Sequence, residues 1–279
     1  MKFVKMHGTG NDFVIIEPPA EEVDWPALAK KACDRHFGIG ADGVILALPS
    51  ERADMRMRIF NPDGSEAEMC GNGIRCLSLY ALEKGLARGD GGALTVDTLS
   101  GILTAELERK EGQVQQVRVA MGKPRFAAQD LPMAIETDKP IIDYPLQLDG
   151  AQLSVTCLSM GNPHAVHFLS QSLNAYPLET VGPRVEHHPL FPQRTNFEVA
   201  FVHDRENIEM RVWERGAGMT MACGSGACAV TVAARLRGMV ADKAQVALPG
   251  GVLTIEWDGE GDVYLSGPAE FVFEGNWTP

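Results

Sequence analysis

The stretch Val212–Gly226, VWERGAGMTMACGSG, repeats the stretch Ile59–Gly73, IFNPDGSEAEMCGNG. Each copy ends in the same Cys-Gly-x-Gly motif, with Cys70 in the first and Cys223 in the second. A glycine-rich turn after a short strand pattern is typical of the beginning of a helix. The chain is therefore predicted to contain two related halves, each with one cysteine just before a helix.

The repeat extends well beyond the two motifs. The copies lie 153 positions apart, and the same offset still relates Lys84–Leu86 to Arg237–Met239. Farther along, Gly101–Glu106 matches Gly251–Glu256 at an offset of 150. A match this long indicates duplication of a whole folding unit.

The repeat also sets the expected fold and domain limits. A chain of 279 residues is long enough for two domains of ordinary size. We predict a mixed α/β (α+β) fold with two pseudo-symmetric domains, each a strand-rich mixed sheet around a central helix. The N-terminal half is expected to span 1–121, joined by a C-terminal strand within 265–279, and the C-terminal half to span 122–264.

Local patterns place the main elements of these halves. Gly85 and Gly238 stand where a glycine commonly ends a helix, after the two apolar helices that follow the motifs. A third helical stretch covers 26–33. Alternating or β-branched residues between turn residues predict strands at 13–16, 43–47, 55–60, 94–96, 103–107, 114–119 and 263–273.

Composition narrows the classes of function and location. The net charge is −12, without a run of Lys or Arg, which argues against a nucleic acid or an anionic membrane as partner and favours a small-molecule substrate. No apolar stretch approaches the roughly 18 residues that a membrane-spanning helix needs. Met1–His7 alternates like a strand and does not resemble a signal peptide. A cytoplasmic protein is expected.

The six cysteines are expected to be reduced thiols and not disulfides or zinc ligands. A chain of this length without a signal peptide favours free thiols. The close pairs have the spacings C-x5-C and C-x4-C, and neither has a histidine at the spacing of a zinc finger, so no metal is predicted. Cys33, Cys76 and Cys228 fall inside helices, where a free cysteine usually serves as a small buried apolar residue.

A thiol at a helix start has chemical consequences. The unpaired N–H groups and the helix dipole favour the thiolate and should lower the thiol pKa from about 8.5. The glycines at 71, 73, 224 and 226 let a carboxylate approach those N–H groups closely. One such motif is often only a tight turn, but two in register favour a paired function. Two thiols can supply the acid and the base on opposite faces of one carbon.

Six strings in the chain are specific when they occur together: Lys5–Phe13, Phe60–Ser65, Met69–Cys76, Met160–His164, Glu214–Gly218 and Ala222–Cys228. They closely resemble the diaminopimelate epimerase family, and the resemblance runs from Met1 to about Phe273. It implies an isomerase without a cofactor that interconverts LL- and meso-diaminopimelate, on the route to lysine and peptidoglycan. It also implies a homodimer, with the active site in the cleft between two pseudo-symmetric domains.

The resemblance assigns roles to individual residues. It makes Cys70 and Cys223 the acid/base pair, and it implies that His164 and Glu214 adjust the pKa values of the two thiols. Arg215 would bind the distal carboxylate of the substrate, for which a guanidinium is well shaped. Glu214 would pair with an ammonium group. The remaining substrate-binding positions that it implies are Asn11, Asn61, Gly71, Asn72, Asn162, Asn196, Gly224 and Ser225.

The chain departs from the family pattern at a few positions. Gly43 stands where many members have Gln, Met219 stands where Glu is common, and Asn196 is followed by Phe197-Glu198 in a variable segment. These departures affect details of binding.

Two other functions share parts of the pattern. A proline racemase or hydroxyproline epimerase has a similar duplicated fold with two cysteines, but Glu214, Arg215 and the asparagines favour a substrate with a second charged end. A relative without epimerase activity, such as an isomerase of this fold that lacks the thiol pair, is disfavoured because both thiols are present.

Overall fold

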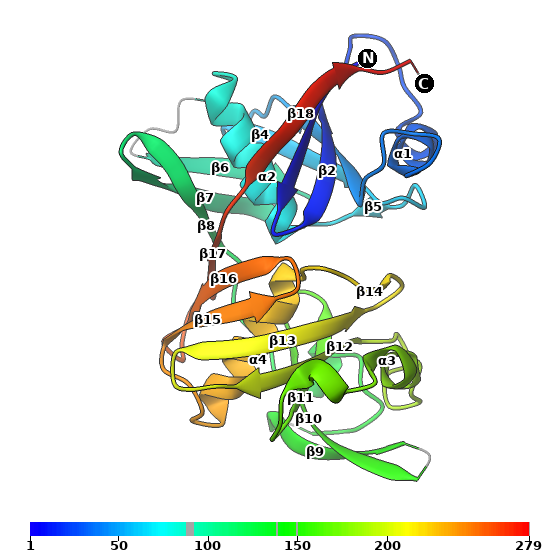
Figure 1. Ribbon diagram of the computed structural model, residues 1–279, viewed down its shortest axis with the longest axis vertical. Coiled ribbons are helices and arrows are strands. Elements are labelled where there is room, and N and C mark those ends of the chain that lie inside the picture. The colour runs from blue at the N-terminus through cyan, green and yellow to red at the C-terminus, as the bar shows by residue number, and fades with distance from the viewer. Residues whose placement is uncertain (88–91, 138, 149, 279) are drawn as a thin grey trace. The chain divides into compact units, whose positions relative to one another are not determined.

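The computed structural model describes residues 1–87, 92–137, 139–148 and 150–278. They form two compact units: unit 1 is Met1–Ala120 with Ser266–Pro279, and unit 2 is Met121–Leu265. Both units combine helices with a mixed sheet, which confirms the predicted α and β class (Figure 1). The predicted domain ranges also include 88–91, 138, 149 and 279, which lie outside the described residues, and the domain limits stay a prediction.

Unit 1 is a mixed sheet with one helix on each face. The strand pairing runs β18–β1–β2–β3–β4–β6–β7–β8, with the short β5 also against β4; β2–β3 and β4–β6 are parallel and the other pairs are antiparallel. The elements are β1 (Lys2–Gly8), β2 (Asn11–Ile16), α1 (Trp25–Cys33), β3 (Gly43–Leu48), β4 (Met55–Phe60), β5 (Glu66–Ala67), α2 (Gly71–Glu83), β6 (Ala93–Thr98), β7 (Gly101–Lys110), β8 (Gln113–Ala120) and β18 (Glu270–Asn276).

Helix α2 is the central element of unit 1. It contacts all the strands from β1 to β4 and from β6 to β8, and Figure 1 shows it lying inside them while α1 lies outside. Residues 71–81 of α2 are all buried, because the strands of unit 1 surround this largely apolar helix. The helix ends where predicted, because Gly85 adopts a φ of +68° and its N–H bonds to the carbonyl of Leu82.

Strand β1 does not show the alternation predicted for Met1–His7. Val4, Lys5 and Met6 are all buried, because β1 lies between β2 and β18 with α2 against it. Burial of the Lys5 ammonium is offset by Asp12, whose carboxylate lies 2.7 Å from Nζ. A strand covered on both faces loses the period of two that a half-exposed strand would show.

Unit 2 repeats the topology of unit 1. The pairing runs β9–β10–β11–β12–β13–β15–β16, with the short β14 also against β13; β11–β12 and β13–β15 are parallel, which are the positions of the two parallel pairs in unit 1. Its elements are η2 (Ala128–Asp130), β9 (Ile141–Leu148), β10 (Ala151–Ser159), β11 (Pro163–Phe168), η3 (Leu173–Ala175), α3 (Leu178–Glu186), β12 (Asn196–Val202), β13 (Asn207–Glu214), β14 (Gly218–Met219), α4 (Gly224–Leu236), β15 (Lys243–Leu248) and β16 (Gly251–Glu256).

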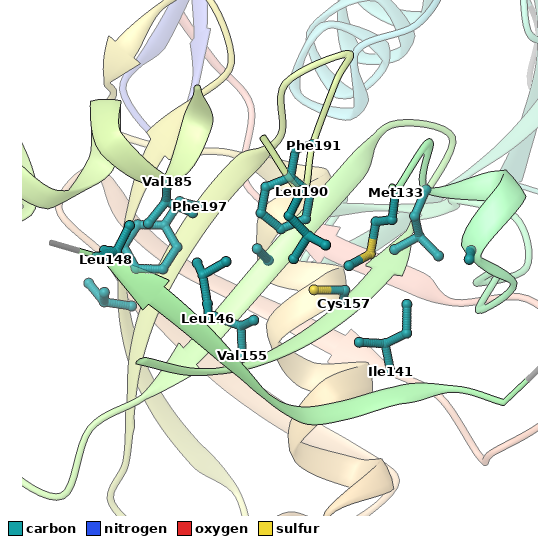
Figure 2. Close-up of a cluster of buried hydrophobic side chains, with 14 of the residues drawn as sticks. Met133, Ile141, Leu146, Leu148, Val155, Cys157, Val185, Leu190, Phe191 and Phe197 are labelled. Atoms are coloured by element: carbon teal, nitrogen blue, oxygen red, sulfur yellow. The ribbon is translucent and has the colours of Figure 1, made fainter. Parts of the chain in front are cut away.

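Side chains on the two faces of the unit 2 sheet have different surroundings. Phe197 and Val199 of β12 join an apolar cluster beneath α3, where Figure 2 shows Phe197 beside Val185. The residue between them, Glu198, faces the other way and lies beside Gly226 at the start of α4. Alternation along β12 therefore aims one charged side chain at the helix that follows Cys223.

The C-terminal segment returns to unit 1. The stretch predicted as one strand is broken near Pro268 into β17 (Tyr264–Gly267), which crosses the boundary between the units, and β18, which pairs antiparallel with β1. The ammonium group of Met1 donates a hydrogen bond of 2.7 Å to the carbonyl of Trp277. Both ends of the chain therefore lie side by side in unit 1 (Figure 1).

Candidate functional site

Cys70 is the N-cap of α2. Its backbone is extended, with φ −145° and ψ 115°, and its sulfur accepts a hydrogen bond of 3.5 Å from the N–H of Gly73. The sulfur also lies 3.8 Å from Oδ1 of Asn11. The structure thus has this thiol at a helix start, as predicted, with the N–H of Gly73 directed at the sulfur.

Amide side chains surround the Cys70 thiol. Nδ2 of Asn72 donates to Oδ1 of Asn11 at 3.0 Å, and Nδ2 of Asn11 donates to Asp42 at 2.9 Å. The buried guanidinium of Arg75 then donates to Oδ1 of Asn72 at 2.9 Å. Unit 1 thus brings together three of the predicted site residues, Asn11, Cys70 and Asn72, in one hydrogen-bonded group, and Gly71 follows Cys70 as the first residue of α2.

Two other positions singled out in unit 1 have a local explanation. Asn61 lies in the turn after β4, where its Nδ2 donates to Oγ of Ser65 at 2.9 Å, and its role in substrate binding stays a prediction. At Gly43 a Cβ atom would lie 3.1 Å from the carbonyl oxygen of Phe60. Glutamine at 43 would require the backbone to shift, so the departure from the family pattern fits the local packing.

Cys223 is the N-cap of α4 and occupies the place in unit 2 that Cys70 occupies in unit 1. Its backbone is extended, with φ −126° and ψ 109°, and Gly224 begins the helix. The sulfur is buried and lies 3.6 Å from Oγ of Ser225. The two copies of the motif have therefore folded alike.

The electrostatic surroundings of Cys223 contradict the predicted fall in thiol pKa. Burial, and then the negative charges of Glu214 and Glu198, raise the pKa of Cys223 well above its ordinary value. The hydroxyl of Ser225 and the N–H of Gly226 oppose this, but they are the smaller effects. The prediction of a lowered pKa is wrong for Cys223, because desolvation and two carboxylates outweigh one helix terminus. The surroundings of Cys223 therefore favour the neutral thiol over the thiolate.

A chain of hydrogen bonds links the second thiol region to a buried ion pair. Nδ2 of Asn162 donates to Oγ of Ser225 at 3.3 Å, and Oδ1 of Asn162 lies 2.9 Å from Nε2 of His164. On its other side, Nδ1 of His164 lies 2.7 Å from Oε1 of Glu198. Three predicted site residues, Asn162, His164 and Ser225, are thus connected through side chains.

Glu198 is a further residue near Cys223 that was not predicted from the sequence. Its side chain is fully buried, and Oε2 has no hydrogen-bond partner among the described residues. Burying a carboxylate costs free energy unless it has a partner, and the partner of Glu198 is the ring of His164. The signal in the sequence was a lone glutamate within the otherwise apolar strand NFEVAFV.

Glu214 and Arg215 lie at the end of β13. Burial raises the pKa of Glu214; Thr220 lowers it as a hydrogen-bond donor, the charge of Glu198 raises it, and Cys223 and His164 lower it. Arg215 is exposed, and its backbone N–H donates to Oδ1 of Asn196 at 2.9 Å. Asn196 in turn donates from Nδ2 to the carbonyl of Pro163 at 2.9 Å. Asn196 therefore supports the loop of Arg215, and its contact with substrate stays a prediction.

Within the part of the chain that the structure describes, no three or more His, Cys, Asp or Glu side chains are grouped to hold a metal ion. Among those same residues, no helix combines the length and apolar character needed to cross a membrane.

Comparison with known sequences gives one consistent family. The family model described as diaminopimelate epimerase matches residues 3–127 and 156–272. A diaminopimelate epimerase of Moorella thermoacetica is 54% identical over 279 residues, covering 99% of each chain. One from Acetivibrio thermocellus is 50% identical, covering 99% of this chain and 98% of that relative.

Solved structures share the fold at low identity. A Bacillus anthracis phenazine biosynthesis protein of the PhzF family has a TM-score of 0.72 at 18% identity, covering 99% of this chain and 98% of the other. A hydroxyproline epimerase from Agrobacterium vitis also has a TM-score of 0.72, at 16% identity, covering 99% and 91%. At this level of identity the likeness shows the fold alone.

Proposed function

Because the chain belongs to the diaminopimelate epimerase family, we propose that it inverts one α-carbon of diaminopimelate and so interconverts the LL and meso forms. The observation that carries the proposal is the repeated thiol. Each unit places one cysteine, Cys70 or Cys223, at the N-cap of its central helix. Identity of 54% over the full length supports the same reaction. The alternative of a proline racemase or hydroxyproline epimerase has only a fold likeness at 16% identity in its favour.

In the proposed mechanism the two thiols act on opposite faces of the α-carbon. One thiolate removes the α-proton, and the other thiol delivers a proton to the far face, so the configuration inverts. Backbone N–H groups at Gly71, Asn72, Gly224 and Ser225 would bind the carboxylate at the reacting centre. These dipoles stabilise the negative charge that develops on that carboxylate as the proton leaves. Burial and the charges of Glu214 and Glu198 raise the pKa of Cys223, which favours its neutral thiol and suits it to act as the acid.

The direct test is incubation of reduced protein with LL-diaminopimelate, followed by chiral analysis of the product. Cys70→Ala and Cys223→Ala should each abolish epimerisation with unchanged circular dichroism, since either variant lacks one of the two proton-transfer groups. Cys76→Ala and Cys228→Ala are matched controls from the same two helices and should keep activity. Near-normal turnover by either of the first two variants would refute the assignment.

Epimerisation in deuterium oxide distinguishes a mechanism with two thiols from a mechanism with a single base. In deuterium oxide the thiol that delivers a proton has already exchanged, so the product should carry deuterium at the inverted carbon from the first turnover. Unreacted substrate should stay protiated early in the reaction. A single base serving both faces would instead return part of the original proton, which mass spectrometry of early product would detect. Activity should also survive dialysis and hydroxylamine, because no pyridoxal phosphate takes part.

Arg215 is proposed to bind the distal carboxylate of the substrate, with Glu214 pairing an ammonium group. The guanidinium is exposed and has one long contact, of 3.4 Å, to the carbonyl of Gln193, so its fork is available for a carboxylate. Arg215→Lys should lower kcat/KM for diaminopimelate about tenfold or more, because an ammonium cannot make the paired hydrogen bonds. Wild-type activity in this variant would remove Arg215 from the site.

We also propose a cytoplasmic homodimer. All six cysteines are free thiols, which suits a reducing compartment. Phe271, Val272 and Phe273 of β18 are each at least 42% exposed and form an apolar strip that a second copy would cover. Sedimentation should give twice the mass of the chain, and cell fractionation should place the protein with cytosolic markers. A monomer, or a membrane-bound fraction, would contradict these two assignments.

A further inference from the structure

The proposed distal binding residues lie at the tip of a hairpin. Strands β13 and β14 pair Trp213 with Met219 and Glu214 with Gly218, and the backbone N–H of Ala217 closes the turn onto the carbonyl of Glu214 at 3.1 Å. We call residues 213–219 the hairpin tip. A turn of this kind is exposed on its outer side, so its position depends on what holds it from the inner side.

Neighbouring residues of the hairpin tip point to opposite faces of the sheet. Trp213 pairs with Phe197 of β12 and packs against the apolar cluster beneath α3, whereas Glu214 is turned toward Cys223. The indole lies directly on Gly182 of α3, where a Cβ atom would come within 2.5 Å of Cγ of Trp213. Glycine at 182 is therefore what allows α3 to approach the indole so closely.

Glu186, the last residue of α3, holds the hairpin tip at two points. Its Oε2 accepts a hydrogen bond of 2.7 Å from Nε1 of Trp213, and its Oε1 accepts one of 2.9 Å from the backbone N–H of Gly216. The residue is only 3% exposed. Its charge is balanced by Arg194, 3.7 Å from Oε1, and Nδ1 of His187 lies 3.8 Å from Oε2.

The two hydrogen bonds lie on either side of Glu214 and Arg215 in the sequence. One donor precedes this pair and the other follows it, and a third bond, from the N–H of Arg215 to Asn196, lies between them. Because the Glu186 carboxylate accepts from Trp213 before the pair and from Gly216 after it, it restrains the backbone of the two residues between these donors. Hydrogen bonds to a buried charged group are among the stronger ones in proteins.

We propose that Glu186 is a positioning residue for substrate recognition, which acts by holding the hairpin tip so that Glu214 and Arg215 meet the distal end of the substrate. The assignment rests on the proposed function of these two residues. Glu186 itself does not touch the substrate. Its effect is therefore expected in binding more than in the chemical step, because the thiols that transfer protons belong to other elements.

The test compares two substitutions with a control on the same helix. Glu186→Gln keeps the size but leaves one of the two donors facing an amide NH2 group, and KM for diaminopimelate should rise about tenfold with a smaller change in kcat. Trp213→Phe keeps the ring against Gly182 but removes the Nε1–H donor, and should raise KM by less. Glu179→Gln, exposed in the first turn of α3, should change neither constant.

A double variant tests whether Glu186 acts through Arg215. In an Arg215→Lys background one of the two positioned contacts is already lost, so adding Glu186→Gln should raise KM by a smaller factor than it does in the wild-type background. Fully additive losses, or an unchanged KM in folded Glu186→Gln, would overturn the proposal. If Glu186→Gln does not fold, Trp213→Phe is compared in the same way, alone and combined with Arg215→Lys. Additive losses in that pair would likewise overturn the proposal.

A measurement without substrate separates this inference from the proposed reaction. The indole N–H signal of Trp213, assigned by its loss in Trp213→Phe, should move upfield in Glu186→Gln, because its charged acceptor is gone. Amide exchange in peptides covering the hairpin tip should become faster in Glu186→Gln and stay unchanged in Glu179→Gln. If these signals respond but the wild-type protein does not epimerise diaminopimelate, the hairpin restraint stands and the proposed function fails. If they do not respond, the restraint is wrong whatever the activity.

Discussion

The imidazole ring of His164 is hydrogen-bonded on both sides inside unit 2. Nε2 faces Oδ1 of Asn162, which only accepts, so Nε2 carries a hydrogen. Nδ1 lies 2.7 Å from Oε1 of Glu198. The ring is therefore the partner of the buried Glu198 carboxyl group, and this pairing makes its burial tolerable.

Removing the charge of Glu198 should change the titration of Cys223. Glu198 raises the pKa of Cys223, so Glu198→Gln should lower that pKa and increase the thiolate fraction at any pH below it. Alkylation of Cys223 at pH 8, followed by peptide mapping in a Cys70→Ala background, should therefore become faster. The high-pH limb of the activity profile should shift in the same direction.

The matched control for Glu198→Gln is Glu206→Gln, an exposed substitution in the turn before β13. It should leave the alkylation rate of Cys223 unchanged. A Glu198→Gln protein that is folded but alkylates at the wild-type rate would show that Glu198 does not influence the thiol.

At the scale of the element, α2 and α4, the helices that follow Cys70 and Cys223, differ in the space around their third residue. A Cβ at Gly73 would meet the tip of Ile45 at 3.0 Å, and its next neighbour is Cβ of Cys70 at an ordinary 3.5 Å. A Cβ at Gly226 would lie 3.0 Å from Oε1 of Glu198 and 3.3 Å from the sulfur of Cys223. The flexible end of Ile45 can move aside, whereas Glu198 is held by His164.

Gly226→Ala should therefore reduce activity much more than Gly73→Ala. The alanine at 226 pushes directly on Glu198 and on the thiol, and overpacking of this kind typically costs about 1–3 kcal/mol. Activity and urea unfolding of the two variants measured side by side would check this, with each serving as the control for the other. Equal activities would mean that the surroundings of Cys223 relax as easily as those of Cys70.

Sequence patterns predicted the elements whose ends are marked by nearby residues in the chain. Strands β3 and β4 and the ends of α2 and α4 were predicted to within a residue or two, since turns, caps and the repeat all mark them. The strand at the N-terminus was predicted correctly, but its alternating exposure was not found, because burial on both faces of β1 removes alternation. The contacts of Glu186 lie 27 and 30 residues away along the chain, and no local pattern indicates them. Within the site, the lone glutamate at 198 became interpretable only when β11 was placed beside β12.

At the scale of the whole molecule, buried thiols should make stability sensitive to alkali. Burial raises the pKa of both Cys33 and Cys76 from 9.0 to about 12, and it raises the pKa of Cys157 and Cys223 as well. Above pH 9 the unfolded chain therefore loses protons that the folded chain keeps. The stabilisation is complete below pH 9 and is lost as the pH rises toward 12.

Urea unfolding at several pH values between 8 and 11 would measure this loss. Each such thiol contributes up to about 1.4 kcal/mol per pH unit in this window. Cys76→Ala removes one of them, so its free energy of unfolding should fall less steeply with pH even if packing lowers the value at pH 8. Parallel curves for the variant and the wild type would contradict the proposed contribution of Cys76.

The pairing of β18 with β1 places the last strand of the chain beside the first, and this has a consequence for the order of synthesis. A ribosome releases all of unit 2 before it delivers Glu270–Asn276, so unit 1 has to wait with one side of β1 unpaired. During that wait β1 is an open template for the strands of neighbouring nascent chains. Translation speed over the final codons, which changes no residue of the product, should therefore affect how much of the newly made protein reaches the native state.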